Sequence, residues 1–182
     1  MTTDSKSIIL ISNGIITPGY LQGVQEVVFQ KFGLPVIIME NQGELAPFFD
    51  PYRKQYNANE LLKDTARLAP ANAYKTIGLY RVDLFIPILT YIFGQAILNG
   101  PTAVVSLHRL KNEFYGLKKD ETLVLVRFKK VVVHELGHSF GLKHCHQYGC
   151  VMNSSTYVEE LDQKSNDFCR QCLLILSSAL KD

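Results

Sequence analysis

The residues best suited to chemistry begin at His134, where the chain reads His-Glu-Leu-Gly-His and then carries Gly141 and His144. Residues four apart share one face of a helix, so His134 and His138 can aim two imidazoles at one metal ion. Glu135 can then reach a water on that metal. Gly141 permits the sharp positive-φ turn that ends a helix, after which the chain can fold back and bring in His144. Three protein ligands plus water is the arrangement of a catalytic zinc.

The alternative for these histidines is a solvated helix face, because a bare His-Glu-x-x-His pattern also occurs by chance in unrelated helices. Gly141 and His144 fall where the longer motif requires them, and four of the five histidines lie between 134 and 146. The spacing therefore favours the metal site. His146 is left over, and we expect no role for it.

All four cysteines follow directly, as Cys145, Cys150, Cys169 and Cys172. Two close pairs are typical of a closed, tetrahedral structural zinc site, while two disulfides or buried free thiols are the alternatives. Residues 1–6 lack the shape of a signal peptide, so we expect no oxidising compartment and favour zinc. If the chain is extended there, the side chains of His144 and Cys145 point opposite ways and bind different metals.

The order of these residues, with Met152 two positions after Cys150, resembles that of the archaemetzincins, a family of metzincin-like zinc peptidases. The motif runs from His134 to Cys172. Sixteen residues separate Met152 from Cys169, about one fewer than in the family pattern. Weaker similarities lie upstream, at residues 55–58, 83–85, 93–96, 105–110 and 113–116. The resemblance covers most of the chain after residue 50.

The resemblance implies a zinc-dependent peptidase with two zinc ions per chain. The catalytic zinc would lie on His134, His138 and His144, and the structural zinc on the four cysteines. Glu135 would be the general base. Met152 would form an apolar floor beneath the catalytic histidines, although a methionine in an ordinary core gap is the alternative. The substrate would be a peptide or protein, and the resemblance does not carry over the residue preference.

The expected mechanism follows from this ligand set. Zinc lowers the pKa of its bound water to about 7, and Glu135 would take a proton from that water and pass it to the leaving amine. Tyr157 is a candidate oxyanion donor, His108 a candidate residue of the substrate cleft, and Asp83 a candidate hydrogen-bond partner of the metal ligands. For each of the three, an ordinary structural role is the alternative. Two alternatives stay open: a zinc hydrolase of a non-peptide substrate, and a peptide-binding zinc protein with little turnover. The presence of Glu135 argues against a binding protein with little turnover.

Composition is that of a compact globular protein. The chain has 182 residues, 47% of them apolar and 20% charged, which predicts a single domain over residues 1–182. We expect an upper part, 1–141, with the sheet and the active-site helix, and a lower part, 142–182, with the cysteine site and a closing helix. A net charge of +2 indicates neither nucleic acid nor a membrane as partner. The longest apolar run, 84–94, contains Pro87 and is too short to span a bilayer. We expect a cytoplasmic protein.

Strand-like and helix-like segments alternate along the chain, which predicts a mixed α/β fold with a mostly parallel sheet. With the resemblance, this gives a metzincin-like zincin fold: a twisted, mostly parallel sheet with an antiparallel edge strand, an active-site helix and a small C-terminal part with a helix. Strands are expected at 7–12, 34–39, 76–80 and 103–107, and helices at about 18–32, 58–69, 121–140 and 167–180.

Two of these segments carry specific expectations. Residues 123–133 are rich in β-branched side chains and favour a strand, yet the zinc motif requires a helix there, and we give the metal geometry precedence. Residues 103–107 are the candidate exposed edge strand, on which a peptide could bind as an added strand. The alternative is that this strand is internal to the sheet.

Overall fold

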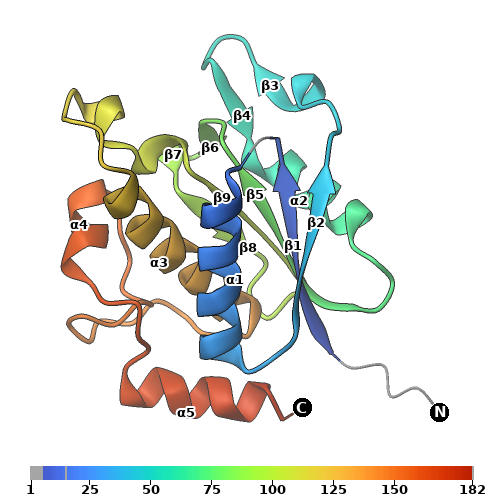
Figure 1. The fold of residues 1–182 in the computed structure, drawn as a ribbon, viewed down its shortest axis with the longest axis vertical. Helices are drawn as coiled ribbons and strands as arrows, with labels where there is room; N and C mark the ends of the chain where they lie inside the picture. Colours follow the sequence, from blue (N-terminus) through green and yellow to red (C-terminus); the bar gives the residue numbers. More distant parts are fainter. Residues whose placement is uncertain (1–5, 15, 182) are drawn as a thin grey trace.

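A five-stranded sheet forms the middle layer of the fold (Figure 1). The computed structural model describes residues 6–14 and 16–181, so most of the amino-terminal stretch read for a signal peptide lies outside the described residues. In spatial order the strands are β2 (Val36–Asn41), β1 (Ser7–Asn13), β5 (Ala73–Tyr80), β9 (Thr102–Ser106) and β8 (Gly94–Ala96). In this order the first four strands are parallel and the last is antiparallel, which confirms the expected sheet.

Helices cover both faces of this sheet (Figure 1). Helix α1 (Pro18–Phe32) and helix α3 (Glu121–Ser139) pack on one face, where they build the larger core with β1, β5 and β9. Helix α2 (Ala58–Leu68) packs on the other face, over a smaller core. Alternate residues of β9 supply the two cores, Ala103 and Val105 the larger and Val104 the smaller, because neighbouring side chains point to opposite faces.

The predicted helix ends are confirmed by local chemistry. Helix α1 starts at Pro18, whose fixed φ suits the first turn, and it ends at Gly33 in the left-handed conformation with φ 66°. The Gly33 N–H donates to the Phe29 carbonyl at 2.9 Å. Helix α2 starts after Asn57, whose side-chain oxygen accepts from the Asn59 N–H at 3.0 Å.

Helix α3 contains the segment with strand propensity, and its helical state confirms the precedence given to the metal motif. Asp120 caps it by accepting from the Leu123 N–H at 2.9 Å. Its buried residues include Val124, Phe128 and the three consecutive valines before His134, so it is covered on most sides. Burial of these apolar side chains outweighs the small cost of β-branched residues in a helix.

A second, small sheet was not predicted. Its strands have two to four residues each, in the order β3 (Phe49–Asp50), β4 (Gln55–Asn57), β6 (Leu84–Ile86) and β7 (Leu89–Ile92). Such short segments show no alternation of apolar and polar residues that could mark a strand. Short 3₁₀ turns accompany them at η1 (Ala46–Phe48), η2 (His108–Leu110) and η3 (Asn112–Tyr115).

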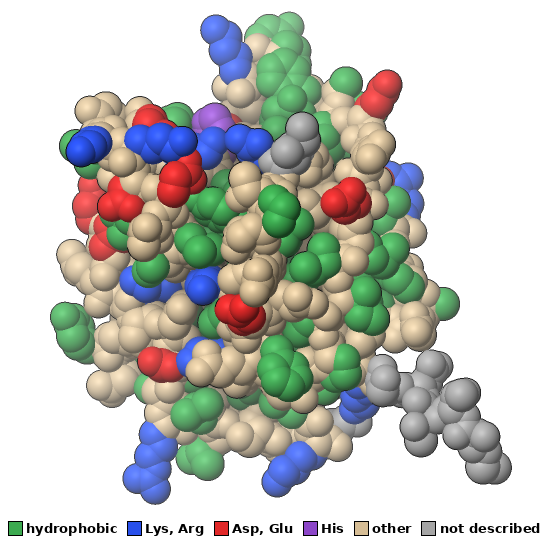
Figure 2. All heavy atoms as spheres, viewed as in Figure 1, with side chains coloured by type: hydrophobic (Ala, Val, Ile, Leu, Met, Phe, Trp, Pro, Cys, Tyr) green, Lys and Arg blue, Asp and Glu red, His purple; other side chains and the backbone are tan. Residues whose placement is uncertain are grey.

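The chain after α3 is mostly irregular and closes with two helices. The predicted closing helix is α5 (Arg170–Ala179), and a further short helix, α4 (Val158–Gln163), was not predicted. No helix within residues 6–14 and 16–181 has the length and apolarity needed to cross a membrane. Figure 2 shows basic and acidic side chains interspersed on the face that it presents, without a broad patch of one sign there.

The interpretation of 103–107 as the exposed edge strand is wrong. These residues form β9, which is hydrogen-bonded to β5 on one side and to β8 on the other. The edge next to β9 is β8, whose Gly-Gln-Ala sequence carries no strand signal of its own, and the other edge of the sheet is β2. The antiparallel edge expected of the fold is therefore present, but it is supplied by a different segment.

Prolines in the two strands should separate an edge position from an internal one. Ile97 N–H donates to the Thr102 carbonyl and Ser106 N–H to the Phe93 carbonyl, so by alternation the Gln95–Val104 pair is hydrogen-bonded and the Ala96 N–H points away from β9. Val104→Pro should therefore lower the free energy of unfolding by about 3 kcal/mol or more, whereas Ala96→Pro should cost much less. Urea unfolding measures both, and equal losses would contradict the assignment of the edge.

Candidate active site

Three histidines from separate parts of the motif converge on one point. The ligand nitrogens of His134, His138 and His144 all lie within 4.8 Å of one another. The Nδ1 atoms of His134 and His138 lie 2.8 Å and 2.7 Å from the carbonyl oxygens of Val151 and Leu142, so each Nδ1 carries a proton. Each Nε2 then has a lone pair, and the two Nε2 atoms are 3.0 Å apart. Two facing lone pairs repel unless a cation lies between them, which fits a metal ion.

Burial favours the neutral form that a metal requires of these side chains. It lowers the pKa of His134 well below its usual value and lowers the pKa values of His138 and His144 as well. A neutral imidazole offers its lone pair without first losing a proton. The donor set therefore suits zinc, which prefers nitrogen and sulfur ligands.

The turn at Gly141 brings His144 to the other two histidines. Gly141 has φ 88°, which only glycine adopts without strain. Its N–H donates to the His138 carbonyl at 2.9 Å, and the Leu142 N–H donates to the Gly137 carbonyl at 3.0 Å. This pair of bonds is the Schellman ending of a helix, and it reverses the chain directly after the second histidine.

Glu135 lies against the edge strand. Its side chain is 7% exposed and lines the cavity beside the histidines. Burial raises the pKa of the Glu135 carboxyl to about 8, and the positive charge of Lys164 opposes that rise. A Cβ atom on Gly94 of β8 would lie 2.7 Å from Glu135 Cγ and 2.9 Å from the Val104 carbonyl oxygen. The glycine is thus required for the close approach of the edge strand to this carboxylate, a role that the sequence did not reveal.

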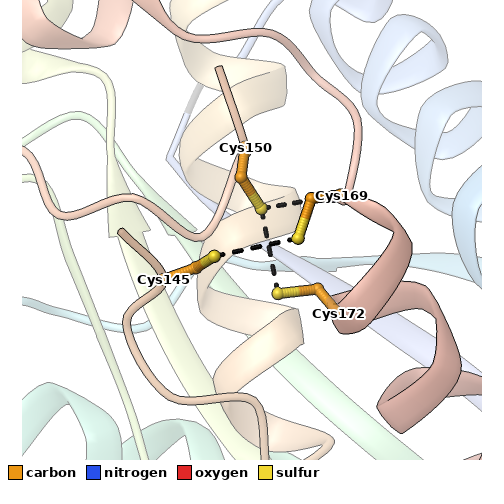
Figure 3. A group of neighbouring side chains, drawn as sticks. All are labelled: Cys145, Cys150, Cys169 and Cys172. Atoms are coloured by element: carbon orange, nitrogen blue, oxygen red, sulfur yellow. Dashed lines mark hydrogen bonds between the residues drawn. The ribbon is translucent and has the colours of Figure 1, made fainter. Parts of the chain in front are cut away.

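The four cysteines form a second cluster (Figure 3). The Sγ atoms of Cys145 and Cys169, and those of Cys150 and Cys172, are 3.8 Å apart. A disulfide requires about 2.0 Å, whereas sulfurs at about 2.3 Å from a tetrahedral zinc are about 3.8 Å apart. Burial raises the pKa values of Cys150 and Cys172, whereas a hydrogen bond from the Cys172 backbone lowers the pKa of Cys169 to about 7. Four adjacent thiolates would repel one another without a cation between them. The distances favour a closed zinc site over disulfides.

Met152 packs beneath the active-site helix. It is fully buried, and its Sδ would lie 2.5 Å from a Cβ atom on Gly137, which stands between the two helical histidines. The Cys145 N–H donates to the Met152 carbonyl at 2.9 Å. Met152 therefore contacts the helix that carries His134 and His138 and the strand of backbone that carries Cys145.

A cavity of about 600 Å³ opens in front of the histidines. Its roof comes from β7 and β8, and its floor from α3 and from residues 154–157. The Tyr91 hydroxyl donates to the Thr156 carbonyl at 2.8 Å and so ties the roof to the floor. Tyr157, the candidate oxyanion donor, lines the cavity but is 61% exposed. Lys164 also lines it, although nothing in the sequence motifs singled it out.

Two other candidates lie away from the histidines. Asp83 forms an ion pair with Arg109 at 2.6 Å, and Gln55 also donates to its carboxylate, so it is a structural carboxylate rather than a partner of the ligands. His108 packs against the Phe114 ring and does not line the cavity. Arg109 in turn stacks on Tyr91, which connects this ion pair to the roof of the cavity.

Comparison with known proteins agrees with this geometry. The model of peptidase family M54 matches residues 16–178. The chain belongs to peptidase family M54. Among curated archaemetzincins, that of Saccharolobus solfataricus is 37% identical over 164 residues, covering 87% of this chain and 88% of the relative. That of Methanopyrus kandleri is 43% identical over 133 residues, covering 73% and 72%.

Solved structures of this family have the same fold. The crystal structure of the Methanopyrus kandleri archaemetzincin matches with a TM-score of 0.86 at 34% identity, covering 100% of this chain and 99% of that one. A zinc-dependent peptidase from Methanocorpusculum labreanum gives 0.81 at 31% identity, covering 93% and 99%. The resemblance to the archaemetzincins is therefore confirmed, as is the metzincin-like fold, and the chain is a zinc metallopeptidase that acts on peptides.

Gly94→Ala should lower peptidase activity without loss of zinc. The new methyl group meets Glu135 and the Val104 backbone, and the backbone cannot give way, so the carboxylate is displaced. A displacement of about 1 Å costs roughly 10²-fold in rate. Steady-state kinetics and metal analysis measure both quantities. Gly19→Ala on α1, where an added Cβ meets nothing within 4 Å, is the control, and equal activity of the two variants would contradict the contact.

Proposed function

We propose that this peptidase hydrolyses its substrate with Glu135 as the general base and with one zinc ion on His134, His138 and His144. Zinc held there supplies Lewis acidity toward the peptide carbonyl and toward the attacking water. Glu135 accepts a proton from that water and delivers it to the leaving amine. The observation that carries the proposal is the convergence of three neutral imidazoles beside one buried carboxylate in a cavity.

The neighbours of Glu135 support its role as a base. Burial raises its pKa to about 8, so it binds a proton more readily than an exposed carboxylate, as a group that accepts and returns a proton must. Gly94 keeps the edge strand close, and the outward N–H and carbonyl groups of β8 can hold an extended peptide beside the carboxylate. The peptide backbone is thereby positioned without demands on particular side chains.

We propose that a second zinc ion binds the four cysteines and has a structural role. The cluster joins the loop after α3 to the start of α5, because Cys145 and Cys150 lie in that loop and Cys169 and Cys172 at the helix (Figure 3). His144 directly precedes Cys145, so the closed site fixes the third histidine from behind. Met152 then acts as the apolar floor, packed against Gly137.

The division of the chain follows from the same arrangement. We propose one domain with an upper part, residues 1–141, that carries the sheet and the active-site helix. The lower part, residues 142–182, carries the cysteine cluster and the closing helix. In support, the cavity takes its roof and Glu135 from the upper part and His144 and residues 154–157 from the lower part.

Glu135→Gln tests the base. The amide keeps the shape of the side chain but cannot accept a proton, so peptide hydrolysis should fall by about 10²- to 10⁴-fold while zinc content and melting temperature are retained. His138→Ala is the matched variant, which should lose one zinc ion because it removes a ligand. Activity assays with metal analysis measure both. Near-normal turnover of Glu135→Gln would overturn the mechanism.

Cys172→Ser tests the structural zinc. Removal of one thiolate opens a closed site and should release its metal, loosening α5 and lowering activity although the residue does not line the cavity. Hydrogen exchange should show lost protection over Arg170–Ala179. Full protection of that segment in a variant with one zinc fewer would contradict the proposed role.

A further inference from the structure

Lys164 is a buried lysine in the wall of the active-site cavity. It is 6% exposed, and the motif that identifies the metal site does not include it. Its Nζ donates to the Asn153 carbonyl at 2.7 Å, and an ammonium has three protons to donate. Among the described residues no carboxylate forms an ion pair with it. Its one hydrogen-bond partner is therefore neutral, and the Glu135 carboxyl acts on it only through space.

A buried ammonium without an ion-pair partner lowers stability, because the interior does not replace the water that it loses. A hydrogen bond to one carbonyl does not require a full charge, since a neutral donor could make it. The position of the charge, in a cavity wall rather than in the core, indicates that its partner is a ligand. Burial lowers the pKa of Lys164 to about 8, so the side chain is still largely protonated at neutral pH.

The remainder of the cavity makes this charge distinctive. Of the residues that line it, Glu135 is the one acidic residue and Lys164 the one lysine or arginine. Glu135 has its own role at the reacting bond, so Lys164 is the cavity's one cation available for recognition. Val131 lies one turn of α3 before Glu135, and Leu161 lies three residues before Lys164. Both line the same cavity and offer an apolar wall to the methylene groups of a substrate side chain.

We propose that Lys164 anchors a carboxylate subsite, in which its ammonium binds a carboxylate of the peptide substrate. The carboxylate belongs either to an aspartate or glutamate side chain or to the free C-terminus of the peptide. This inference rests on the proposed peptidase function and names its substrate class. Lys164 thereby determines specificity, and the bond-breaking chemistry remains with Glu135.

The test uses matched peptides and two buried lysines. One peptide series carries a single Glu or Gln at each position around the cleaved bond, with the C-terminus amidated. A second series has no acidic side chain and carries a free or an amidated C-terminus. Lys164→Met is compared with Lys130→Met, because Lys130 is also 6% exposed and also donates to one carbonyl at 2.7 Å, but does not line the cavity.

The wild-type enzyme should prefer the carboxylate at one position by roughly 10- to 100-fold in kcat/KM, the range for a hydrogen bond to a charged group. A preference in the first series assigns the subsite to an acidic side chain, and one in the second series to the C-terminus. Lys164→Met should bring the ratio of kcat/KM for the carboxylate peptide to kcat/KM for its neutral counterpart close to one. The Gln and amidated peptides should still be cleaved. Lys130→Met should keep the ratio.

Three results would overturn the proposal. Equal cleavage of acidic and neutral peptides by the wild-type enzyme shows that there is no carboxylate subsite, and this result does not depend on whether the variant folds. A Lys164→Met enzyme that keeps the preference shows that another group binds the carboxylate. A uniform loss of kcat for every peptide, with the ratio unchanged, places Lys164 in the chemical step instead. Failure of the wild type to cleave any peptide would contradict the proposed function itself.

Discussion

The convergence of three imidazole lone pairs on one point is the constraint on which the rest of this structure depends. Two of the imidazoles come from adjacent turns of one helix, and their Nε2 atoms lie 3.0 Å apart. The third requires that the helix end and the chain reverse within six residues of the second, which Gly141 permits with its φ of 88°. The lone pairs repel one another, so the surrounding protein must hold them until a cation offsets that repulsion.

The protein holds the histidines from two sides. Carbonyl groups at Val151 and Leu142 fix the rings of His134 and His138 through their Nδ1 atoms. The cysteine cluster holds the backbone next to His144, and Met152 fills the space under Gly137. The proposed zinc site on the four cysteines would have no open position, which suits a supporting role, whereas the histidine site faces the cavity and can admit substrate.

The sequence could predict those parts of the site that a local motif encodes. The ligand spacing was sufficient to assign a helix to residues 123–133 against their propensity, because a metal site imposes a geometry that propensity does not. The main sheet followed from its long apolar strands. The edge strand β8 and the small sheet could not be predicted, since strands of two to four residues exist only through their pairing. Lys164 was missed for a similar reason: its burial and its place in the cavity are set by tertiary contacts.

Anomalous diffraction at the zinc absorption edge, from crystals of the native protein, tests the central claim most directly. The account predicts two peaks per chain. One lies among the converging ring nitrogens of His134, His138 and His144 beside Glu135, and the other at the centre of the four cysteine sulfurs. Histidine rings turned away from one another without metal, or continuous density joining cysteine sulfurs at about 2.0 Å as disulfides, would contradict it.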